Sequence, residues 1–231
     1  DVAAPVLPPL AQASVFYLVP PPKQGDGDPR LERFLAALPD ARALVYLGTS
    51  AVYGDCGGAW VDETAPLKPG TARGRRRLAA ERLALDWGAR RNVPVMILRV
   101  PGIYGPGRLP RARLEKGLPV LREDDSPWTN RIHADDLATA ALCVAERGAP
   151  GAAYNVSDGQ PTTMADYFNR CADLLGLPRP PPVSRAEAQA RLTPEMLSFL
   201  EESKRLDTRR LRALGWVPRY PSLAEGLPAC L

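Results

Sequence analysis

The sequence predicts an α/β protein, in which a parallel sheet is joined to a smaller, mostly helical C-terminal lobe. Three almost continuously apolar runs, Val15–Val19, Leu44–Leu47 and Val95–Val100, have the length and composition of buried strands. Helical patterns separate these runs, and strands that alternate with helices form parallel βαβ units. Apolar runs become rare after Val100, so the second lobe is expected to be mostly helical.

The helices between these strands begin and end at recognisable residues. Asp28 followed by Pro29 predicts a helix start, because the fixed φ of proline suits the first turn, and Pro39 ends the pattern. A longer helix is predicted from about residue 71 to 91 and is closed by Asn92. Each of the first two strands is therefore followed by a helix that returns the chain to the sheet.

Further elements are predicted after the third strand, although residues 101–131 give no assignable pattern. Asp135 and Asp136 predict the first turn of a helix, where carboxylates face the positive end of the helix dipole, and Gly148 ends it. The remaining predicted elements are a strand at Ala153–Val156 and helices that start near Thr163, Ser184, Thr193 and Thr208.

Composition and charge exclude several classes of partner. The net charge is +4 with a pI near 9.0, but the cations are scattered arginines without interleaved aromatic residues, so no nucleic-acid partner is expected. No apolar run reaches the ~20 residues that cross a bilayer, so no membrane partner is expected. Four widely spaced cysteines and a single histidine give no metal site. Free thiols fit a reducing compartment, so a cytoplasmic location is expected.

The stretch 43–55, ALVYLGTSAVYGD, ends a predicted strand in polar residues that can carry chemistry. Its apolar part breaks at Gly48 and is followed by the adjacent hydroxyls of Thr49 and Ser50. Ligands of open α/β sheets bind outside the carboxyl ends of the strands. Thr49 is therefore a candidate for a functional site, and the alternative is a hydroxyl that only caps the end of the strand.

Four spaced motifs together resemble one protein family. TSAVYGD begins at Thr49, LRVPGIYGPGR at Leu98, RIHADDLATA at Arg131 and DTRRLRALGWVPRYP at Asp207. In this order and spacing they resemble the extended short-chain dehydrogenase/reductase family, in its NAD-dependent epimerase/dehydratase branch. The resemblance covers nearly the whole sequence from Val15 on.

This resemblance implies a partial Rossmann-type sheet that holds NAD or NADP and a smaller lobe that holds a small-molecule substrate. The Rossmann part would comprise residues 1–105, with 132–157 returning to it, and would open close to the fourth strand of the family. Residues 106–131 and 158–231 would form the substrate-binding lobe. A homodimer is one assembly that the family allows.

The glycine-rich turn that follows the first strand in the family has no counterpart in this sequence. Gly102, Gly105 and Gly107 follow a predicted strand, but Pro106 interrupts them and no helix pattern begins there. A glycine pattern binds a dinucleotide only in a strand–turn–helix context, so these glycines are expected to form a loop.

The family's Tyr-x-x-x-Lys pair is also replaced. Counting back from the adjacent Ala80 and Glu81 puts Arg73 at the tyrosine position and Arg77 at the lysine position. Arginine stays protonated, so Arg73 cannot act as a general base. Arg77 could still hold a ribose or a phosphate through its fork of donors.

Carrying the family's roles over to matching positions gives a set of candidate site residues. Thr49 is the candidate catalytic residue, because the Ser/Thr at this position in the family hydrogen-bonds the reacting oxygen of the substrate. The candidate cofactor-binding residues are Val19, Pro20, Thr49, Ser50, Arg77, Pro101, Gly102 and Ile103. The candidate substrate-binding residues are Tyr53, Tyr104, Arg108 and Arg131.

Several of these residues, and also His133, have an alternative structural role. Tyr53 and Tyr104 could supply a phenol, but a tyrosine with a pKa near ~10 needs a cationic neighbour to act at neutral pH, and packing is the alternative. His133 suits acid–base chemistry by type, and its alternative is to anchor the lobe interface. Arg108 and Arg131 could grip an anionic substrate such as a nucleotide-sugar phosphate, or could be surface charges.

Two functions remain open at this point. The first is an NAD(P)-binding, epimerase/dehydratase-like oxidoreductase that acts on a hydroxyl-bearing small molecule such as a nucleotide sugar. The second is a non-catalytic NAD(P)-binding sensor or assembly factor that keeps the fold and has lost the Tyr/Lys pair.

Overall fold

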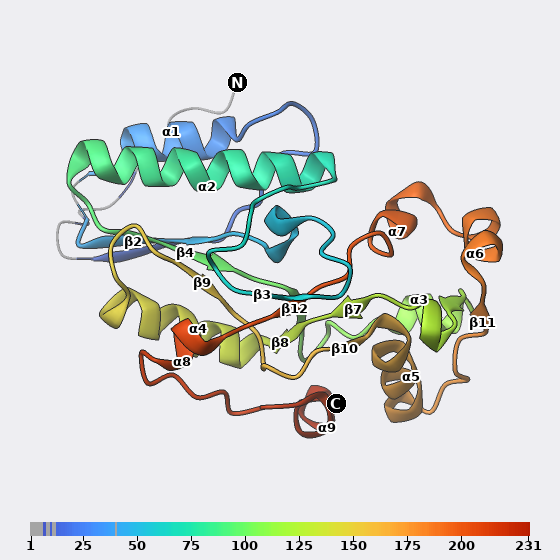
Figure 1. The fold of residues 1–231 in the computed structure, drawn as a ribbon. Helices are drawn as coiled ribbons and strands as arrows, with labels where there is room; N and C mark the ends of the chain where they lie inside the picture. The colour runs from blue at the N-terminus through green and yellow to red at the C-terminus, as the bar shows by residue number, and fades with distance from the viewer. Residues whose placement is uncertain (1–6, 8–9, 11–12, 40) are drawn as a thin grey trace.

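A four-stranded parallel sheet lies at the centre of the computed structural model, which describes residues 7, 10, 13–39 and 41–231 (Figure 1). The strand order is β1-β2-β4-β9, and all three pairings are parallel. The strands are β1 (Ser14–Tyr17), β2 (Ala43–Leu47), β4 (Val95–Arg99) and β9 (Ala153–Asn155). The predicted α/β architecture with a parallel, Rossmann-type sheet is confirmed.

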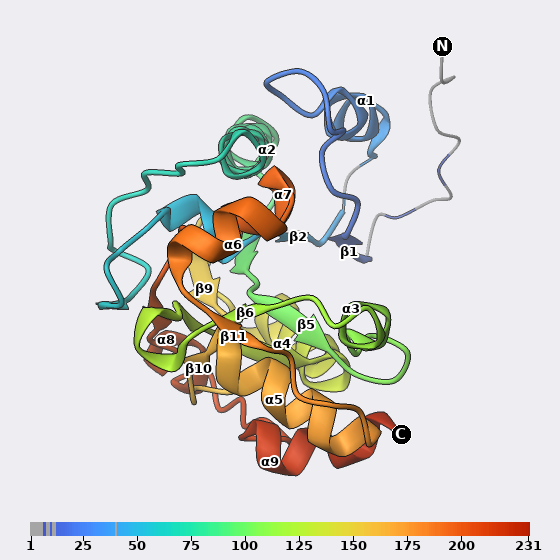
Figure 2. The ribbon, with the colours of Figure 1, turned by 90° about the vertical axis from the view of Figure 1, so that its right-hand side faces the viewer.

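Helices cover both faces of this sheet. Helices α1 (Pro29–Ala37) and α2 (Ala72–Arg91) lie on one face, and α4 (Ala134–Arg147) lies on the other (Figures 1 and 2). The short helix α8 (Arg209–Arg212) contacts β9. Each face thus buries its own apolar cluster, as a three-layer domain requires.

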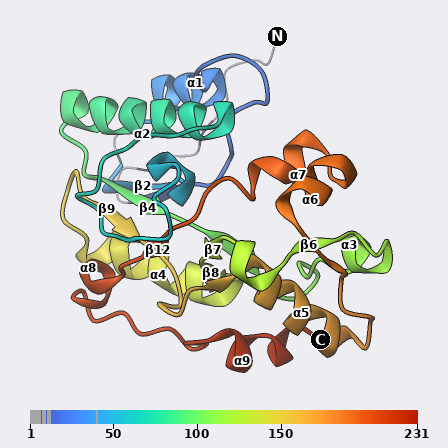
Figure 3. The ribbon, with the colours of Figure 1, turned by 45° about the vertical axis from the view of Figure 1, so that its right-hand side comes forward.

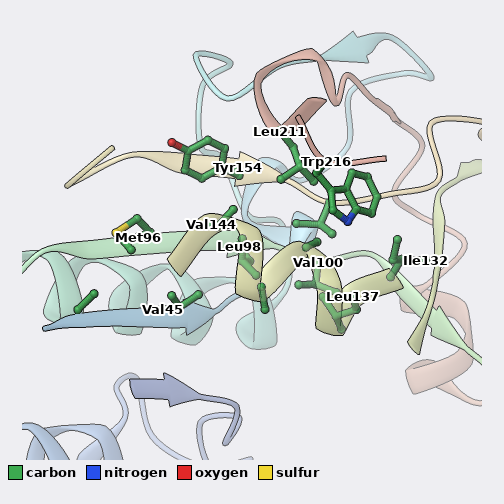
Figure 4. Close-up of a cluster of buried hydrophobic side chains, with 14 residues drawn as sticks. Val45, Met96, Leu98, Val100, Ile132, Leu137, Val144, Tyr154, Leu211 and Trp216 are labelled. Carbon is green, nitrogen blue, oxygen red and sulfur yellow. The ribbon is translucent and has the colours of Figure 1, made fainter. Parts of the chain in front are cut away.

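The core beneath α4 includes the C-terminal segment of the chain. Val45 and Leu98 of the sheet face Val144 of α4, while Leu211 and Trp216 close the same cluster (Figure 4). All five side chains are buried. Because residues far apart in the sequence fill one core, the C-terminal segment is held firmly against the sheet.

Capping residues start and stop the helices where the sequence predicts. The carboxylate of Asp28 accepts the backbone N–H of Arg30 at 3.1 Å, and the hydroxyl of Thr71 accepts that of Gly74 at 3.0 Å. Asn92 ends α2 in the left-handed region with φ 54°. Local side-chain hydrogen bonds to the free N–H groups of a first turn explain why these boundaries can be read from sequence.

The second lobe is mostly helical, as predicted, and carries short strand pairs that the sequence analysis does not foresee (Figure 3). Strand β10 pairs antiparallel with β7, and β11 pairs parallel with β6. Two-residue strands have no periodicity, so their pairing depends on tertiary contacts. The elements are α3 (Arg111–Glu115), β6 (Val120–Leu121), η2 (Glu123–Asp125), β7 (Trp128–Thr129), β10 (Thr162–Thr163), α5 (Met164–Leu175), β11 (Pro182–Val183), α6 (Arg185–Arg191), α7 (Pro194–Ser198), α9 (Leu223–Gly226) and η3 (Pro228–Cys230).

Further short elements connect the sheet to the second lobe. Strand β5 (Gly102–Tyr104) pairs with β8 (Arg131–His133), and β3 (Trp60–Val61) pairs with β12 (Arg205–Leu206), both in parallel. The 3-10 turn η1 (Ser50–Tyr53) follows β2. The division into a Rossmann part and a substrate-binding lobe after residues 105, 131 and 157 stays a prediction.

Strand β1 is shorter at its C-terminal end than the predicted Val15–Val19. Its pairing with β2 ends at Tyr17, opposite Tyr46, and the prolines that follow Val19 donate no ladder hydrogen bond. Leu18 and Val19 leave the sheet and are 61% and 43% exposed. Among the described strands β1 forms one edge of the sheet.

A strand that is unpaired on one side among the described residues, beside exposed apolar residues, should promote association between copies of the chain. We expect the double variant Leu18→Lys/Val19→Lys to shift the protein toward monomer, because charge beside an edge opposes pairing. Size-exclusion chromatography with light scattering measures the shift. Val217→Lys, at an exposed position on the C-terminal segment, serves as the control. A monodisperse monomer of the unchanged protein would contradict this expectation.

A buried charged network joins the carboxyl ends of the strands. Arg99 at the end of β4 pairs with Glu81 of α2, with 2.6 Å between Nη2 and Oε1, and both side chains are almost inaccessible. Nη1 of Arg99 donates to the hydroxyl of Tyr53 at 3.0 Å, and that hydroxyl donates to Oδ1 of Asn155 at 2.7 Å. The network therefore links α2, β4, η1 and β9 in one place.

Breaking this pair should strongly destabilise the fold. Arg99→Met leaves Glu81 buried without its partner, so the free energy of unfolding should fall by about 3–5 kcal/mol. Urea denaturation measures the loss. Arg179→Met removes an arginine from an exposed pair with Asp173 and should change the free energy of unfolding by less than about 1 kcal/mol. If Arg99→Met and Arg179→Met both changed the free energy of unfolding by less than about 1 kcal/mol, the network would not stabilise the carboxyl end of the sheet.

Candidate functional site

Two adjoining clefts open at the carboxyl ends of β2 and β4. The first, called the lobe cleft here, has a volume of about 580 Å³ and lies between the sheet and the second lobe. The second, called the sheet cleft, has a volume of about 740 Å³ and lies along β1, β2 and α4. The two clefts share four lining residues, Thr49, Arg77, Pro101 and Ile103. Such a crevice beyond parallel strands is where open α/β sheets bind ligands.

Thr49 lies at the junction of the two clefts. It follows β2 in an extended conformation, and its hydroxyl oxygen accepts the backbone N–H of Ala51 at 3.3 Å, which caps η1. A hydroxyl that accepts one hydrogen bond keeps its own hydrogen for a ligand. The Thr49 hydroxyl can therefore cap η1 as an acceptor and donate a hydrogen bond to a ligand at the same time, so the two roles left open by the sequence are compatible.

Arg77 of α2 reaches the same junction. Its Nη1 donates to the backbone oxygen of Leu47, the last residue of β2, at 3.0 Å. This contact holds the guanidinium against the strand end beside Thr49 and leaves other donors of the fork for a ligand. The pair of Thr49 and Arg77 thus offers a hydroxyl and a cation at one point.

Most of the expected cofactor-binding residues come together around this junction. The lobe cleft is lined by Thr49, Ser50, Arg77, Pro101, Gly102 and Ile103. Pro20 lines the sheet cleft, whereas Val19 lines neither cleft and projects into solvent. Of the two arginines expected to bind substrate, Arg131 lines the lobe cleft and Arg108 the sheet cleft, so they do not form one anion site.

The two tyrosines expected to bind substrate lie in the core. Tyr53 and Tyr104 are almost fully buried and line neither cleft. Burial raises the pKa of Tyr53 to about 12, although Arg99 beside it acts in the opposite direction. Burial also raises the pKa of Tyr104. Neither phenol can ionise near neutral pH, so the geometry supports the packing role for both.

His133 also has a structural position. Its ring is buried, and its Nδ1 accepts the backbone N–H of Asp135 at 3.2 Å, which caps α4. The ring contacts Tyr104 and Tyr220, with centroid distances of 5.3 Å and 4.3 Å. Because it lines neither cleft, the geometry supports an anchoring role rather than acid–base chemistry.

The lobe cleft contains three arginines that lie over aromatic rings, and of these sequence reasoning missed Arg113. Arg113 belongs to a stretch without a pattern, and its ring partner comes from a distant helix, so only its residue type could have drawn attention to it. Cation–π contacts fix the orientation of such guanidinium groups. The contacts are Arg73 over Phe199 at 4.3 Å, Arg113 over Phe168 at 4.7 Å and Arg131 over Tyr167 at 4.1 Å.

A second missed residue, Asp158, lies next to Arg131 in the structure and does not line the lobe cleft. Its backbone N–H donates to the carbonyl oxygen of Arg131 at 2.9 Å, and its carboxyl group is buried. Burial raises the pKa of Asp158 to about 7, although the backbone N–H of Gln160 and the charges of Arg131 and Arg212 act in the opposite direction. Its Oδ2 has no hydrogen-bond partner within the described part of the chain.

Asp158 predicts a pH-dependent stability. Its pKa is about 7 in the folded protein and ~3.9 in an unfolded chain, so the folded state binds this proton more tightly. The resulting stabilisation is complete below about pH 4 and is lost as the pH rises through 7. In Asp158→Asn this loss is absent. From pH 5 to pH 8 the free energy of unfolding of the wild type should therefore fall by roughly 2 kcal/mol relative to that of Asp158→Asn.

Urea denaturation at both pH values measures this difference. Asp173→Asn, at an exposed carboxylate paired with Arg179, is the matched control and should show no such rise toward pH 8. A difference between Asp158→Asn and wild type that stays constant with pH would contradict the raised pKa.

Comparison with known proteins identifies the family to which this chain belongs. Residues 31–157, more than half of the chain, match the model of the NAD dependent epimerase/dehydratase family. The chain therefore belongs to this family, in agreement with the motifs of its sequence. No helix within the described residues is both long and apolar enough to cross a membrane.

Individual proteins and solved structures are similar to this chain. The 3-diazoavenalumate denitrifying reductase of a Streptomyces species is 32% identical over 200 residues, which are 81% of this chain and 64% of that protein. A conserved protein of unknown function from Silicibacter pomeroyi superposes with a TM-score of 0.79 at 38% identity, covering 94% of this chain and 76% of that structure. MoeE5, solved with UDP-glucose and NAD, superposes at 0.66 with 27% identity, covering 87% and 66%. The chain thus spans slightly less than two thirds of the reductase.

Proposed function

We propose that this chain supplies the nicotinamide end and the substrate site of an NAD(P)-dependent oxidoreductase of the epimerase/dehydratase type. The observation that supports this most directly is the junction of Thr49 and Arg77, where two clefts meet beyond the strands β2 and β4. A hydride donor in one cleft and its acceptor in the other would approach each other at this junction.

The residues of the sheet cleft fit one end of the cofactor. Its walls are mostly apolar, including Leu47 and Val100, and Thr49 and Arg77 are the polar groups at its inner end. This suits a flat nicotinamide ring with its ribose. Among the described residues no glycine-rich turn leads directly from a strand into a helix, so the pyrophosphate is assigned to none of them. When bound, NAD or NADP supplies the nicotinamide ring that accepts or donates a hydride.

The chain's own residues would orient the substrate rather than move its proton. Thr49 donates a hydrogen bond to the oxygen on the reacting carbon, and Arg77 holds a ribose or phosphate. Arg73 stays protonated and cannot act as a base. The group that transfers the proton is none of these residues.

The proposed substrate is a hydroxyl-bearing small molecule, and a nucleotide sugar is the first class to test. Two observations support it: MoeE5 was solved with UDP-glucose and NAD, and the lobe cleft of this chain is rich in arginine. Arginine matches the geometry of phosphate groups.

The alternative function is a non-catalytic NAD(P)-binding sensor or assembly factor. It is favoured by Arg73 and Arg77, which occupy the positions expected for the Tyr/Lys pair. A protein that keeps the cofactor site and lacks the proton-transfer pair would bind the nucleotide without turnover.

A fluorescence titration separates these functions. NADH, NADPH and reduced nicotinamide mononucleotide are titrated, the last because the described residues fit only the nicotinamide end. We expect saturable binding that Arg77→Met weakens by about tenfold, the effect of one charged hydrogen bond. Arg82→Met on the exposed side of α2 is the control. Absence of binding for all three ligands would contradict both functions.

Turnover then decides between them, measured over a panel of sugar nucleotides and simple alcohols. If the protein is an enzyme, Thr49→Val should lower kcat by roughly 100-fold, because a donor to the reacting oxygen is lost. Thr49→Ser keeps the hydroxyl and should retain most of the rate. Binding without turnover of any substrate supports the sensor, and full activity of Thr49→Val would exclude Thr49 from catalysis.

A further inference from the structure

Few side chains in the two clefts can exchange a proton near neutral pH. The described residues that line the sheet cleft include no titratable side chain other than arginine, which does not give up its proton. The lobe cleft adds three further titratable residues, Tyr167, Glu202 and Lys204. Asp158, whose pKa is raised, lines neither cleft. Among the lining residues, proton exchange with a substrate is therefore confined to these three.

Tyr167 cannot serve as the base. Its side chain is buried, and the guanidinium carbon of Arg131 lies 4.1 Å from the centre of its ring. Burial raises the pKa of Tyr167, although the charge of Arg131 acts in the opposite direction. Because the phenol keeps its proton at neutral pH, Glu202 and Lys204 remain.

Glu202 and Lys204 form an ion pair in the wall of the lobe cleft. The Nζ of Lys204 donates to Oε2 of Glu202 at 2.8 Å, and the side chains are 7% exposed for Lys204 and 13% exposed for Glu202. The other carboxylate oxygen, Oε1, has no hydrogen-bond partner within the described part of the chain. A buried ion pair contributes little to stability and is typical of functional sites when it lies in a cleft. The carboxylate thus has one oxygen held by lysine and one left for a donor that enters the cleft.

The segment that carries the pair is fixed on both sides. It leads from α7 of the second lobe into β12 (Figure 1). The hydroxyl of Ser203 accepts the backbone N–H of Trp128 at 3.0 Å, and the N–H of Ser203 donates to Oδ1 of Asp55 at 2.8 Å. The backbone oxygen of Lys204 accepts Nδ2 of Asn130 at 3.0 Å. A carboxylate on such a segment needs little reorganisation when a ligand arrives.

We propose that Glu202 exchanges the proton of the substrate hydroxyl and that Lys204 is its positioning residue. The inference rests on the proposed function, because it takes the lobe cleft as the substrate site. In the oxidising direction the O–H bond breaks and its proton passes to Oε1 of Glu202, directly or through one water. The electron pair of that bond forms the second C–O bond, while the hydrogen on the same carbon leaves with its electron pair for the oxidised dinucleotide. In the reducing direction the carboxyl group returns the proton.

NMR without any dinucleotide tests whether Glu202 reaches the substrate. The carboxyl carbon of every glutamate is labelled with ¹³C, and the signal that is missing from Glu202→Asp belongs to Glu202. UDP-glucose, or another sugar nucleotide of the panel, should shift this signal, because a ligand hydroxyl donates to Oε1. The signal of the exposed neighbour Glu201 is the internal control and should not move. If no member of the panel shifts the Glu202 signal, the proposal is overturned.

Kinetics on a substrate that the panel identifies test the proton exchange itself. Glu202→Gln should lower kcat by about 100-fold or more, the contribution of a general base, and change KM by less than about threefold. Glu202→Asp keeps a carboxylate and should retain more of the rate. Glu201→Gln is the matched control and should leave kcat unchanged.

A double variant separates this role from a structural one. Glu202→Gln alone leaves Lys204 buried without its partner, whereas Glu202→Gln/Lys204→Met removes both charges and relieves that cost. The double variant should fold and stay as slow as Glu202→Gln, since a pair that only supports the fold would give back the full rate. Wild-type turnover by the double variant would overturn the proposal and leave the proposed function standing. A wild-type protein without turnover of any substrate would contradict the enzyme function and this role together.

Discussion

The position of the candidate site depends on one buried ion pair, between Glu81 and Arg99. Two charges removed from water are tolerable only when they satisfy each other, so α2 and β4 must meet at one relative position. Tyr53 and Asn155 extend the pair to η1 and β9 through hydrogen bonds. The turn that carries Thr49 lies between these elements. A network needed for folding thus also fixes where the two clefts meet.

The arginines on the two sides of this junction have different kinds of partner. In the sheet, the buried guanidinium has a carboxylate partner and contributes to the fold. In the lobe cleft, Arg113 and Arg131 lie against aromatic rings and have no carboxylate partner among the described residues. In the first arrangement, loss of either partner would leave a buried charge uncompensated, so the pair constrains the fold. This contrast distinguishes the buried Arg99 from the half-buried arginines of the lobe cleft, which remain accessible to a ligand.

Sequence reasoning was accurate where the controlling interactions are local. The starts of α1 and α2 follow from Asp28 and Thr71, whose side chains bond to N–H groups two or three residues away. The strands β2 and β4 follow from continuous apolar runs, and their carboxyl ends correctly bring Thr49 and Pro101 to one cleft. Sequence reasoning failed for the two-residue strands, and for the C-terminal end of β1, because pairing with a distant partner determines them.

The parallel sheet, the starts of the capped helices and the family could all be predicted from sequence, because apolar runs, capping residues and spaced motifs are local signals. Which polar residues share a site depends on how distant segments pack together. Arg108 and Arg131 look equivalent in sequence, yet they line different clefts. Arg113 had no sequence signal and lies beside Phe168 of α5. Burial and the presence or absence of a charged partner are properties of the folded chain, and they separate a binding side chain from one that supports the core.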